Sequence, residues 1–233
     1  MPPTDSFDKH VEQYEQWFMD HPFVYVSELH AVKELLPKSG SGVEIGSGTG
    51  RFAAPLGIKL GVEPSEAMRR IAEKRGVKTV QGVAEKLPFK DAEFDFALMV
   101  TTVCFLDDVD LAFDEVSRVL RPEGAFIIGF VDRESPIGKE YLKRKDKSVF
   151  YRDATFYTVA ELVSHLERAG FSDFSFRQTL FAPMEEMAEV APVKEGHGEG
   201  SFVAVRGVKR KEAGGPSEGT DKTRSPGSSG GLV

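Results

Sequence analysis

The segment Val43–Gly50, with the sequence VEIGSGTG, places three glycines at alternate positions shortly after an acidic residue. Glycine has no Cβ and tolerates positive φ angles, so these glycines allow a sharp turn from a strand into a helix that brings backbone against a ligand. Glu44, just before them, indicates that a cation or a hydroxyl-rich group is held there. A dinucleotide-binding G-x-G-x-x-G pattern would need its third glycine at position 51, where the chain has Arg51.

Length and composition describe an ordinary folded protein. The chain has 233 residues, of which 40% are hydrophobic and 29% are charged, so we expect one main domain with a packed core. Its formal net charge of -7 gives no general attraction for a phosphate backbone, which argues against a nucleic-acid partner. Small or neutral substrates are therefore favoured.

Cysteine content and hydropathy bear on metal content and location. Cys104 is the only cysteine, so the chain can form neither an internal disulfide nor a cysteine-based metal cluster, and we expect no metal. The sequence contains no run of eighteen apolar residues and no leader-like pattern at its start. We therefore expect a cytoplasmic protein with no membrane partner. The absence of asparagine, with only four glutamines, predicts a heat-loving source.

Short β-rich runs alternate with helical patterns from position 40 to about 130, which is typical of an α/β fold with a parallel sheet. The expected strands are 41–45, 59–63, 79–82, 94–101 and 125–132, then 172–181 and 201–209. The expected helices are 65–75, 109–120 and 158–169. Because a turn-rich stretch at 194–200 and no helix separates the last two strands, they must run antiparallel. The polar segment 133–153 is interpreted as a solvated helix face.

An acidic residue at a characteristic sequence spacing after the glycine turn indicates what kind of ligand the turn binds. Glu63 lies 19 positions after Glu44 (63 − 44), at the end of the second expected strand. An acidic residue at about this spacing can accept hydrogen bonds from both ribose hydroxyls of a nucleoside. The loop 82–89 ends the third strand at the same edge of the sheet, where ligands of open α/β sheets bind. These segments together predict a nucleoside site.

Four motifs in this order resemble the class I S-adenosylmethionine-dependent methyltransferases, and most closely the small-molecule branch that includes the ubiquinone and menaquinone biosynthesis enzymes. They are VEIGSGTGRF, GVEPSEAM, GVAEKLPFKDAEFDFALM and EVSRVLRPEGAFIIG, and the resemblance covers roughly positions 7 to 209. It implies a three-layer Rossmann-like fold with a seven-stranded sheet whose last strand is antiparallel. It also implies S-adenosyl-L-methionine as the cofactor and a small-molecule methyl acceptor.

The resemblance also implies roles for individual residues. Residues expected to hold the methionine part of the cofactor are Glu44, Gly46, Ser47, Gly48 and Gly50. Glu63 is expected to bind the ribose hydroxyls, and Ala84 and Glu85 to meet the adenine. Val83 departs from the polar residue common in the family, so the adenine amino contact passes to Glu85. Pro64 and Met68 are expected to line the adenine ring, with core packing as the alternative.

The stretch FDKHVEQYEQWF, residues 7–18, resembles the helix that covers the cofactor in this branch. Tyr14 is the favoured cofactor contact there, because a phenol can bond a carboxylate while its ring packs. The resemblance therefore implies a helical lid at 1–40 and a methyltransferase domain at 41–210, and composition predicts a disordered tail at 211–233. The tail is rich in Gly, Ser and Pro and cannot bury enough apolar surface to order itself.

The expected reaction is direct displacement of an activated methyl group, which requires alignment more than acid or base chemistry. Thr101 and Thr102, after the fourth strand, are candidates for the acceptor pocket together with Tyr14, and Thr101 is also a candidate cofactor contact. His10 or His21 could act as a base, with a surface role as the alternative for each. The sequence leaves the acceptor, its reacting atom and the oligomeric state open.

Two other functions share these residues. A protein that binds S-adenosylmethionine or S-adenosylhomocysteine without transferring a methyl group would have the same nucleoside site. A nicotinamide-dependent oxidoreductase would share the strand, the glycine turn and the acidic residue, but Arg51 argues against it. The chain also reads MVTTVCFL after the fourth strand, without the N/D-P-P-Y/F run of enzymes that methylate DNA adenine or protein glutamine.

Overall fold

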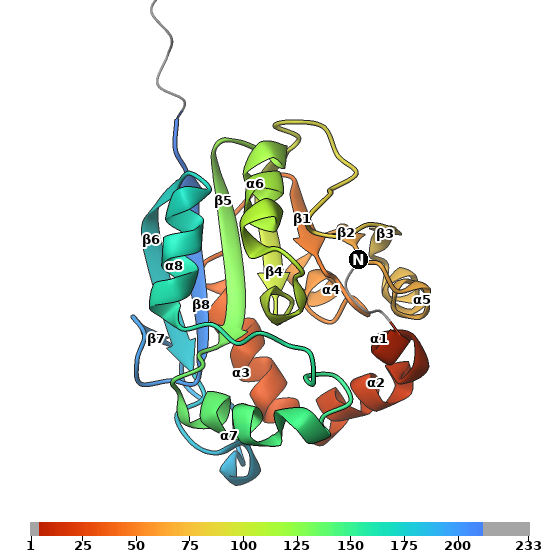
Figure 1. Ribbon diagram of the computed structural model, residues 1–233, viewed down its shortest axis with the longest axis vertical. Coiled ribbons are helices and arrows are strands. Elements are labelled where there is room, and N and C mark those ends of the chain that lie inside the picture. The colour runs from red at the N-terminus through yellow and green to blue at the C-terminus, as the bar shows by residue number, and fades with distance from the viewer. Residues whose placement is uncertain (1–4, 212–233) are drawn as a thin grey trace, which may run out of the picture.

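Figure 1 shows the computed structural model, which describes residues 5–211. Within them, eight strands form one sheet in the order β3-β2-β1-β4-β5-β8-β6-β7. The strands are β1 (Gly42–Ile45), β2 (Leu60–Val62), β3 (Lys78–Val80), β4 (Phe94–Val100), β5 (Leu120–Val131), β6 (Phe171–Thr179), β7 (Lys194–Glu195) and β8 (Phe202–Lys209). The α-helices are α1 (Asp5–Lys9), α2 (Val11–Asp20), α3 (Pro22–Lys33), α4 (Ala53–Leu56), α5 (Glu66–Lys74), α6 (Val109–Val119), α7 (Pro136–Arg144) and α8 (Val159–Arg168).

The sheet is parallel on one side and antiparallel on the other. Strands β1 to β5 pair in parallel, whereas β8 lies antiparallel between β5 and β6. The expected α/β sheet with an antiparallel last strand is therefore confirmed. Strand order reverses between β1 and β4, so the turn after β1 lies at the switch point where open α/β sheets bind ligands.

Helices cover both faces of the sheet (Figure 1). On one face, α6 and α8 bury their apolar stripes against the sheet, through Phe113, Val116, Leu162 and Leu166 among others. On the other face, α3, α4 and α5 form a second core with the opposite side of the strands, through Val32, Ala53 and Ala72 among others. The third helix therefore belongs to the outer layer of the sandwich, while α1 contacts α5 and α2 contacts α3.

The helix starts expected from the sequence are confirmed by side-chain caps. Ser65 Oγ accepts from Met68 N at 3.2 Å, and Asp108 accepts from Leu111 N at 3.0 Å. Thr158 begins α8 with a capping box, in which its hydroxyl and the side chain of the glutamate three residues later each accept from the other's backbone N–H. These caps fix α5, α6 and α8 at the places where short polar side chains precede an apolar stripe.

Two strand predictions differ from the structure. The sheet has one strand more than the seven expected, because the two residues of β7 pair with Arg177 and Gln178 of β6. The expected turn at 194–200 thus begins with a short edge strand. Strand β5 begins at Leu120 rather than at position 125, because Leu120 already pairs with Phe94 of β4. The register then shifts before Ala125 pairs with Phe96, and Glu123 in the intervening stretch adopts φ +64°.

The predicted disordered tail lies outside the described residues from position 212 onward. Its first residue, Lys211, is described and forms an ion pair with Glu123, Nζ to Oε1 3.1 Å. Among the helices of residues 5–211, none combines the length and the apolar character that a bilayer crossing requires.

Candidate functional site

The turn after β1 is built from three glycines with positive φ. Gly46, Gly48 and Gly50 have φ of +69°, +51° and +77°, which residues with a Cβ rarely adopt. Gly46 N and Ser47 N both donate to Val62 O, at 2.8 and 3.0 Å. These bonds fix the turn to the end of β2.

Two of the glycines also lie so close to neighbouring side chains that little room remains for a Cβ atom. A Cβ at Gly46 would lie 2.3 Å from Thr102 Cγ2, and a Cβ at Gly48 would lie 3.2 Å from the Tyr14 hydroxyl oxygen. A methyl group at Gly46 would therefore collide with the residue after β4, and one at Gly48 would fill the space between the turn and α2. The missing side chains leave bare backbone facing the edge of the sheet.

Glu63 is joined to the glycine turn at the end of β2. Its carboxylate accepts from Gly48 N at 2.9 Å and from Ser65 N at 2.8 Å, one bond to each oxygen. Burial raises the pKa of Glu63 to about 7 against these two bonds, which favour the ionised form. Each carboxylate oxygen has a further lone pair, so Glu63 can still accept from hydroxyl groups of a ligand.

Glu44 is buried and points at the start of α4. Its Oε2 accepts from Ala53 N at 2.9 Å, and burial raises the pKa of this carboxyl well above its usual range. The residue thus ties β1 to the helix that follows the turn.

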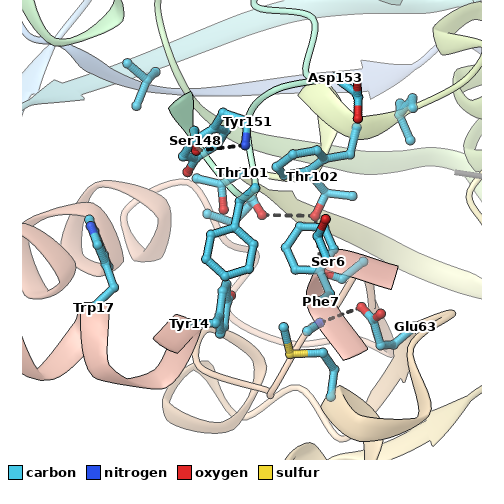
Figure 2. A pocket seen from close by; sticks show the side chains of 18 of the residues that line it. Ser6, Phe7, Tyr14, Trp17, Glu63, Thr101, Thr102, Ser148, Tyr151 and Asp153 are labelled. Atoms are coloured by element: carbon cyan, nitrogen blue, oxygen red, sulfur yellow. Dashed lines mark hydrogen bonds between the residues drawn. The ribbon is translucent and has the colours of Figure 1, made fainter. Parts of the chain in front are cut away.

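A cavity of about 640 Å³ opens beside the turn. It is lined by α1, α2, the turn itself, the ends of β2 and β4, and the segment 144–153. Figure 2 shows Tyr14 and Glu63 near one end of this space and Ser148, Tyr151 and Asp153 near the other. The site is therefore one continuous cavity with a glycine turn at one end and an aromatic segment at the other.

The predicted site residues divide into two groups. Those that line the cavity are Tyr14, Gly46, Gly48, Glu63, Pro64, Met68, Thr101 and Thr102. Those that do not line the cavity are Glu44, Ser47, Gly50, Ala84 and Glu85. The histidines considered as bases, His10 and His21, are also absent from the lining among the described residues.

Ala84 and Glu85, the residues expected to meet the adenine, lie next to the loop that precedes α6. Glu85 Oε1 accepts from Asp107 N at 2.9 Å and from Asp108 N at 3.4 Å, which holds the loop before α6. Ala84 is buried in the core. Val83 of the same segment and Asp107 line the cavity. Glu85 thus shapes the cavity through the loop that it fixes.

The end of β4 brings two threonines to the cavity. Thr101 adopts φ +49°, an uncommon conformation for a β-branched residue, while its N–H donates to Gly129 O at 2.8 Å. Thr102 Oγ1 lies 3.1 Å from both Gly46 O and Val100 O. The strained backbone turns the chain into the cavity wall directly after the strand.

A polar cluster joins α2 to the glycine turn. Glu15 accepts from Thr49 Oγ1 at 2.5 Å and from Arg51 Nη2 at 2.6 Å, and it also pairs with Arg75 at the end of α5. Burial raises the pKa of Glu15, but hydrogen bonds from Arg75, Arg51 and Thr49 outweigh it and hold the pKa at about 2. Arg51, which stands where a dinucleotide site has glycine, therefore anchors the helix that covers the cavity.

Aromatic rings make up much of the cavity wall. The ring of Phe7 stacks on Phe150, centroids 5.3 Å apart, and meets the edges of Tyr14 and Phe105. Burial raises the pKa of Tyr14 above its ordinary range, so its hydroxyl stays protonated near neutral pH. Tyr14 can therefore donate one hydrogen bond beside Gly48.

Some lining residues lie outside the motifs that predicted the site. Arg144 and Lys147 were interpreted as part of a solvated helix face, yet both line the cavity at its outer side. Glu28 of α3 also lines it, and an acidic residue in the mostly apolar stretch FVYVSELHAV is the sequence signal that could have indicated it.

Comparison with known proteins agrees with this architecture. Residues 43–128 match the family model described as a methyltransferase domain. A crystal structure from Thermotoga maritima is 56% identical in sequence and superposes with a TM-score of 0.87. The match covers 89% of this chain and all of the Thermotoga chain. It is described as an S-adenosylmethionine-dependent methyltransferase, possible histamine N-methyltransferase. The chain belongs to the class I S-adenosylmethionine-dependent methyltransferases.

Two further relatives are similar in sequence to this methyltransferase over most of its length. An uncharacterised protein from Methanocaldococcus jannaschii is 46% identical over 203 residues, which make up 87% of this chain and 98% of the relative. An uncharacterised protein from Mycobacterium tuberculosis is 36% identical over 188 residues, 78% of this chain and 66% of the relative. The Thermotoga and Methanocaldococcus relatives come from heat-loving organisms, in keeping with the composition.

The cofactor of this family, S-adenosylmethionine, suits the residues of the methyltransferase cavity. Gly48 leaves a space that a Cβ would fill, and Glu63 keeps acceptor positions beside that space. Pro64 and Met68 add apolar surface on the same side. This combination of bare backbone, a carboxylate and an apolar wall fits a nucleoside with a short polar chain.

Proposed function

We propose that the protein transfers a methyl group from S-adenosylmethionine to a small-molecule acceptor by direct in-line displacement. One observation carries the proposal: the glycine turn and Glu63 share a single cavity with the aromatic segment around Tyr151. A donor bound at the turn and an acceptor bound beside Tyr151 would thus meet inside one enclosed space.

The cofactor would be held by the residues around the turn. The backbone of Gly46 and Gly48 would face its methionine part, and Glu63 would accept from its ribose hydroxyls. Tyr14 would donate a hydrogen bond to its carboxylate. When bound, the cofactor supplies a methyl group on a positively charged sulfur, which is already activated for displacement.

The protein's own contribution would be alignment and exclusion of water. Alignment of reacting groups can contribute roughly 7–11 kcal/mol, so no acid–base pair is required. Phe7, Tyr14 and Trp17 of α1 and α2 would cover the reacting groups, and Glu15 would hold this cover on the turn. We propose that α1 and α2 form the working part of the expected lid, while α3 belongs to the main domain.

The size and position of the cavity favour a small acceptor over a macromolecule. A volume of about 640 Å³ lies within the range of roughly 300–1,000 Å³ typical of small-molecule sites. The net charge of -7 also disfavours a nucleic acid. We further propose a cytoplasmic location, because the single cysteine cannot form an internal disulfide and disulfides are rare in proteins of reducing compartments.

The experiment that tests this proposal is methyl transfer from labelled cofactor. Incubation of the protein with labelled S-adenosylmethionine and small molecules extracted from cells should label at least one small product. Binding of the cofactor without any labelled product would favour a binding protein without transferase activity. Tight binding of NADH in a fluorescence titration, without binding of S-adenosylmethionine, would favour an oxidoreductase.

A further inference from the structure

Glu28 is a buried acidic residue that the proposed transfer does not use. It lies on α3, its exposed fraction is 5%, and it lines the cavity. Among the described residues, no hydrogen bond or ion pair to its carboxylate is found. Burial alone raises the pKa of Glu28 to about 8. The carboxylate therefore faces the cavity without a partner from the chain.

An unpaired carboxylate in such a place is unfavourable for the empty protein. Removing a charged group from water without a compensating partner costs several kcal/mol, which is why buried charges are normally paired. In the empty protein Glu28 is therefore mostly protonated near neutral pH, and a positively charged partner in the cavity would favour its ionised form. The second core, on this face of the sheet, is mostly apolar around α3, where Val24, Ala31 and Val32 are buried. A positively charged partner that enters the cavity would remove this cost by pairing with the carboxylate.

The groups near Glu28 suit a positively charged partner. Tyr141 lines the same cavity as Glu28, and burial, followed by the charge of Glu28, raises the pKa of Tyr141. Tyr141 stacks on Tyr151 with centroids 5.2 Å apart, and Tyr151 stacks on Phe105 at 5.6 Å. Aromatic faces attract cations through their quadrupole, and a carboxylate beside them adds a full opposite charge.

The cationic side chains of the cavity do not neutralise Glu28. Arg144 and Lys147 are exposed at the outer rim, where solvent screens their charge, and Arg144 is paired with Glu140 at 2.6 Å. Asp153 lies on the same rim with the opposite sign. The deep part of the cavity is therefore acidic and aromatic.

We propose that Glu28 binds an ammonium group of the methyl acceptor, so that the acceptor is a small molecule bearing a protonated amine. The assignment rests on the proposed transferase function and names the substrate class of its acceptor end. Glu28 is a recognition residue in this account, and the geometry does not require that the bound ammonium nitrogen be the atom that receives the methyl group.

The test compares two probes of nearly equal shape. 2-Phenylethylamine carries the ammonium group, and 2-phenylethanol replaces it with a neutral hydroxyl. Their binding to the full-length protein is measured by calorimetry at about pH 8.5, where a primary amine with a pKa near that of lysine, about 10.4, is charged. Each titration is run with and without saturating S-adenosylhomocysteine. Glu28→Gln removes the charge with little change of shape, and Glu12→Gln removes an exposed charge on α2 outside the cavity.

The wild-type protein should bind the amine about 10- to 100-fold more tightly than the alcohol, as expected for a hydrogen bond between charged groups. Glu28→Gln should reduce this preference to about twofold or less, and Glu12→Gln should keep it. In turnover with an amine acceptor, Glu28→Gln should raise KM far more than it lowers kcat.

Several results would overturn the assignment. These are equal binding of the two probes, failure of the amine to bind, or a preference that survives in Glu28→Gln. A loss of kcat at unchanged KM would instead indicate a catalytic base. If Glu28→Gln weakened binding of S-adenosylmethionine but not the amine preference, the carboxylate would serve the cofactor. Failure of S-adenosylhomocysteine to bind would contradict the proposed function, and the probe preference measured without it would still decide the role of Glu28.

Discussion

Gly46 is the residue of the turn where both backbone conformation and space exclude a side chain. Gly46→Ala should destabilise the protein, because φ of +69° is unfavourable with a Cβ and the added methyl lies 2.3 Å from Thr102. We expect a loss of about 2 kcal/mol or more in the free energy of unfolding, measured by chemical denaturation.

Gly57 offers a matched control for that variant. It has φ of +77°, but a Cβ there would meet nothing within 4 Å. Gly57→Ala should therefore show the backbone effect alone, about 1 kcal/mol. Equal losses in the two variants would contradict the close approach of the turn to Thr102.

Glu28 should give the folded protein a measurable pH dependence. The folded pKa of about 8 lies above the ordinary glutamate value near 4.3, so this residue contributes a loss of stability as pH rises between those values. Its limiting slope is about 1.4 kcal/mol per pH unit. Glu28→Gln should remove that contribution and become more stable than the wild type at pH 8.

The comparison is made on the difference between the two proteins, because Glu63 also titrates near pH 7 in both. Denaturation curves at several values from about pH 5 to pH 8 give that difference directly. A difference that does not change with pH would show that Glu28 is not the buried, unpaired carboxylate described above.

At the scale of elements, Glu15 of α2 bonds to two residues at the glycine turn and to Arg75 after α5. Glu15→Gln should weaken the contacts with Thr49, Arg51 and Arg75 and lower the free energy of unfolding by about 1 to 2 kcal/mol at pH 7. The stabilising contribution of Glu15 is present above its unfolded pKa near 4.3 and is lost as pH falls toward its folded pKa of about 2.

Glu12→Gln is the control on the same helix, because Glu12 is exposed and stands outside this cluster. Thermal melts at pH 7 and at about pH 3 measure both variants. If Glu15→Gln matched Glu12→Gln at pH 7, the cluster would not be what holds the cover in place.

The sequence predicted elements well where local rules decide them. The starts of α5, α6 and α8 follow from Ser65, Asp108 and Thr158, each of which caps the helix that was expected after it. Strand β7 was missed because two exposed residues carry no alternating pattern and pair only through the neighbouring β6. Elements that depend on a distant partner leave little trace in the local sequence.

The site shows the same division. Turn residues and Glu63 could be placed in advance, because their spacing follows from the strand–turn–helix geometry. Arg144 and Lys147 could not be placed in advance, because their polar segment has the pattern of a solvent-exposed helix. Only the packing of α7 along one side of the cavity brings them to its lining. The acidic Glu28 within the mostly apolar stretch FVYVSELHAV is a local signal, but its place beside the cavity depends on how α3 packs on the sheet.

At the scale of the whole molecule, the amino-acid composition and the source organisms of two relatives both indicate a heat-stable protein. The chain lacks asparagine, and its relatives include proteins from Thermotoga maritima and Methanocaldococcus jannaschii. We expect a Tm above the range of about 45–65 °C in which ordinary mesophilic domains melt. Calorimetry of the full chain measures it, and a Tm within that range would contradict the inference from composition.

The whole fold converges on one claim, that the turn after β1 and Glu63 together bind S-adenosylmethionine. The most direct measurement is the affinity of S-adenosylhomocysteine for the wild type and for Glu63→Ala, with Tm recorded for both. We predict that the wild type binds one molecule and that Glu63→Ala weakens binding by about 1.5–3 kcal/mol while remaining folded. No binding to the wild type, or equal affinity in a folded Glu63→Ala, would contradict this claim.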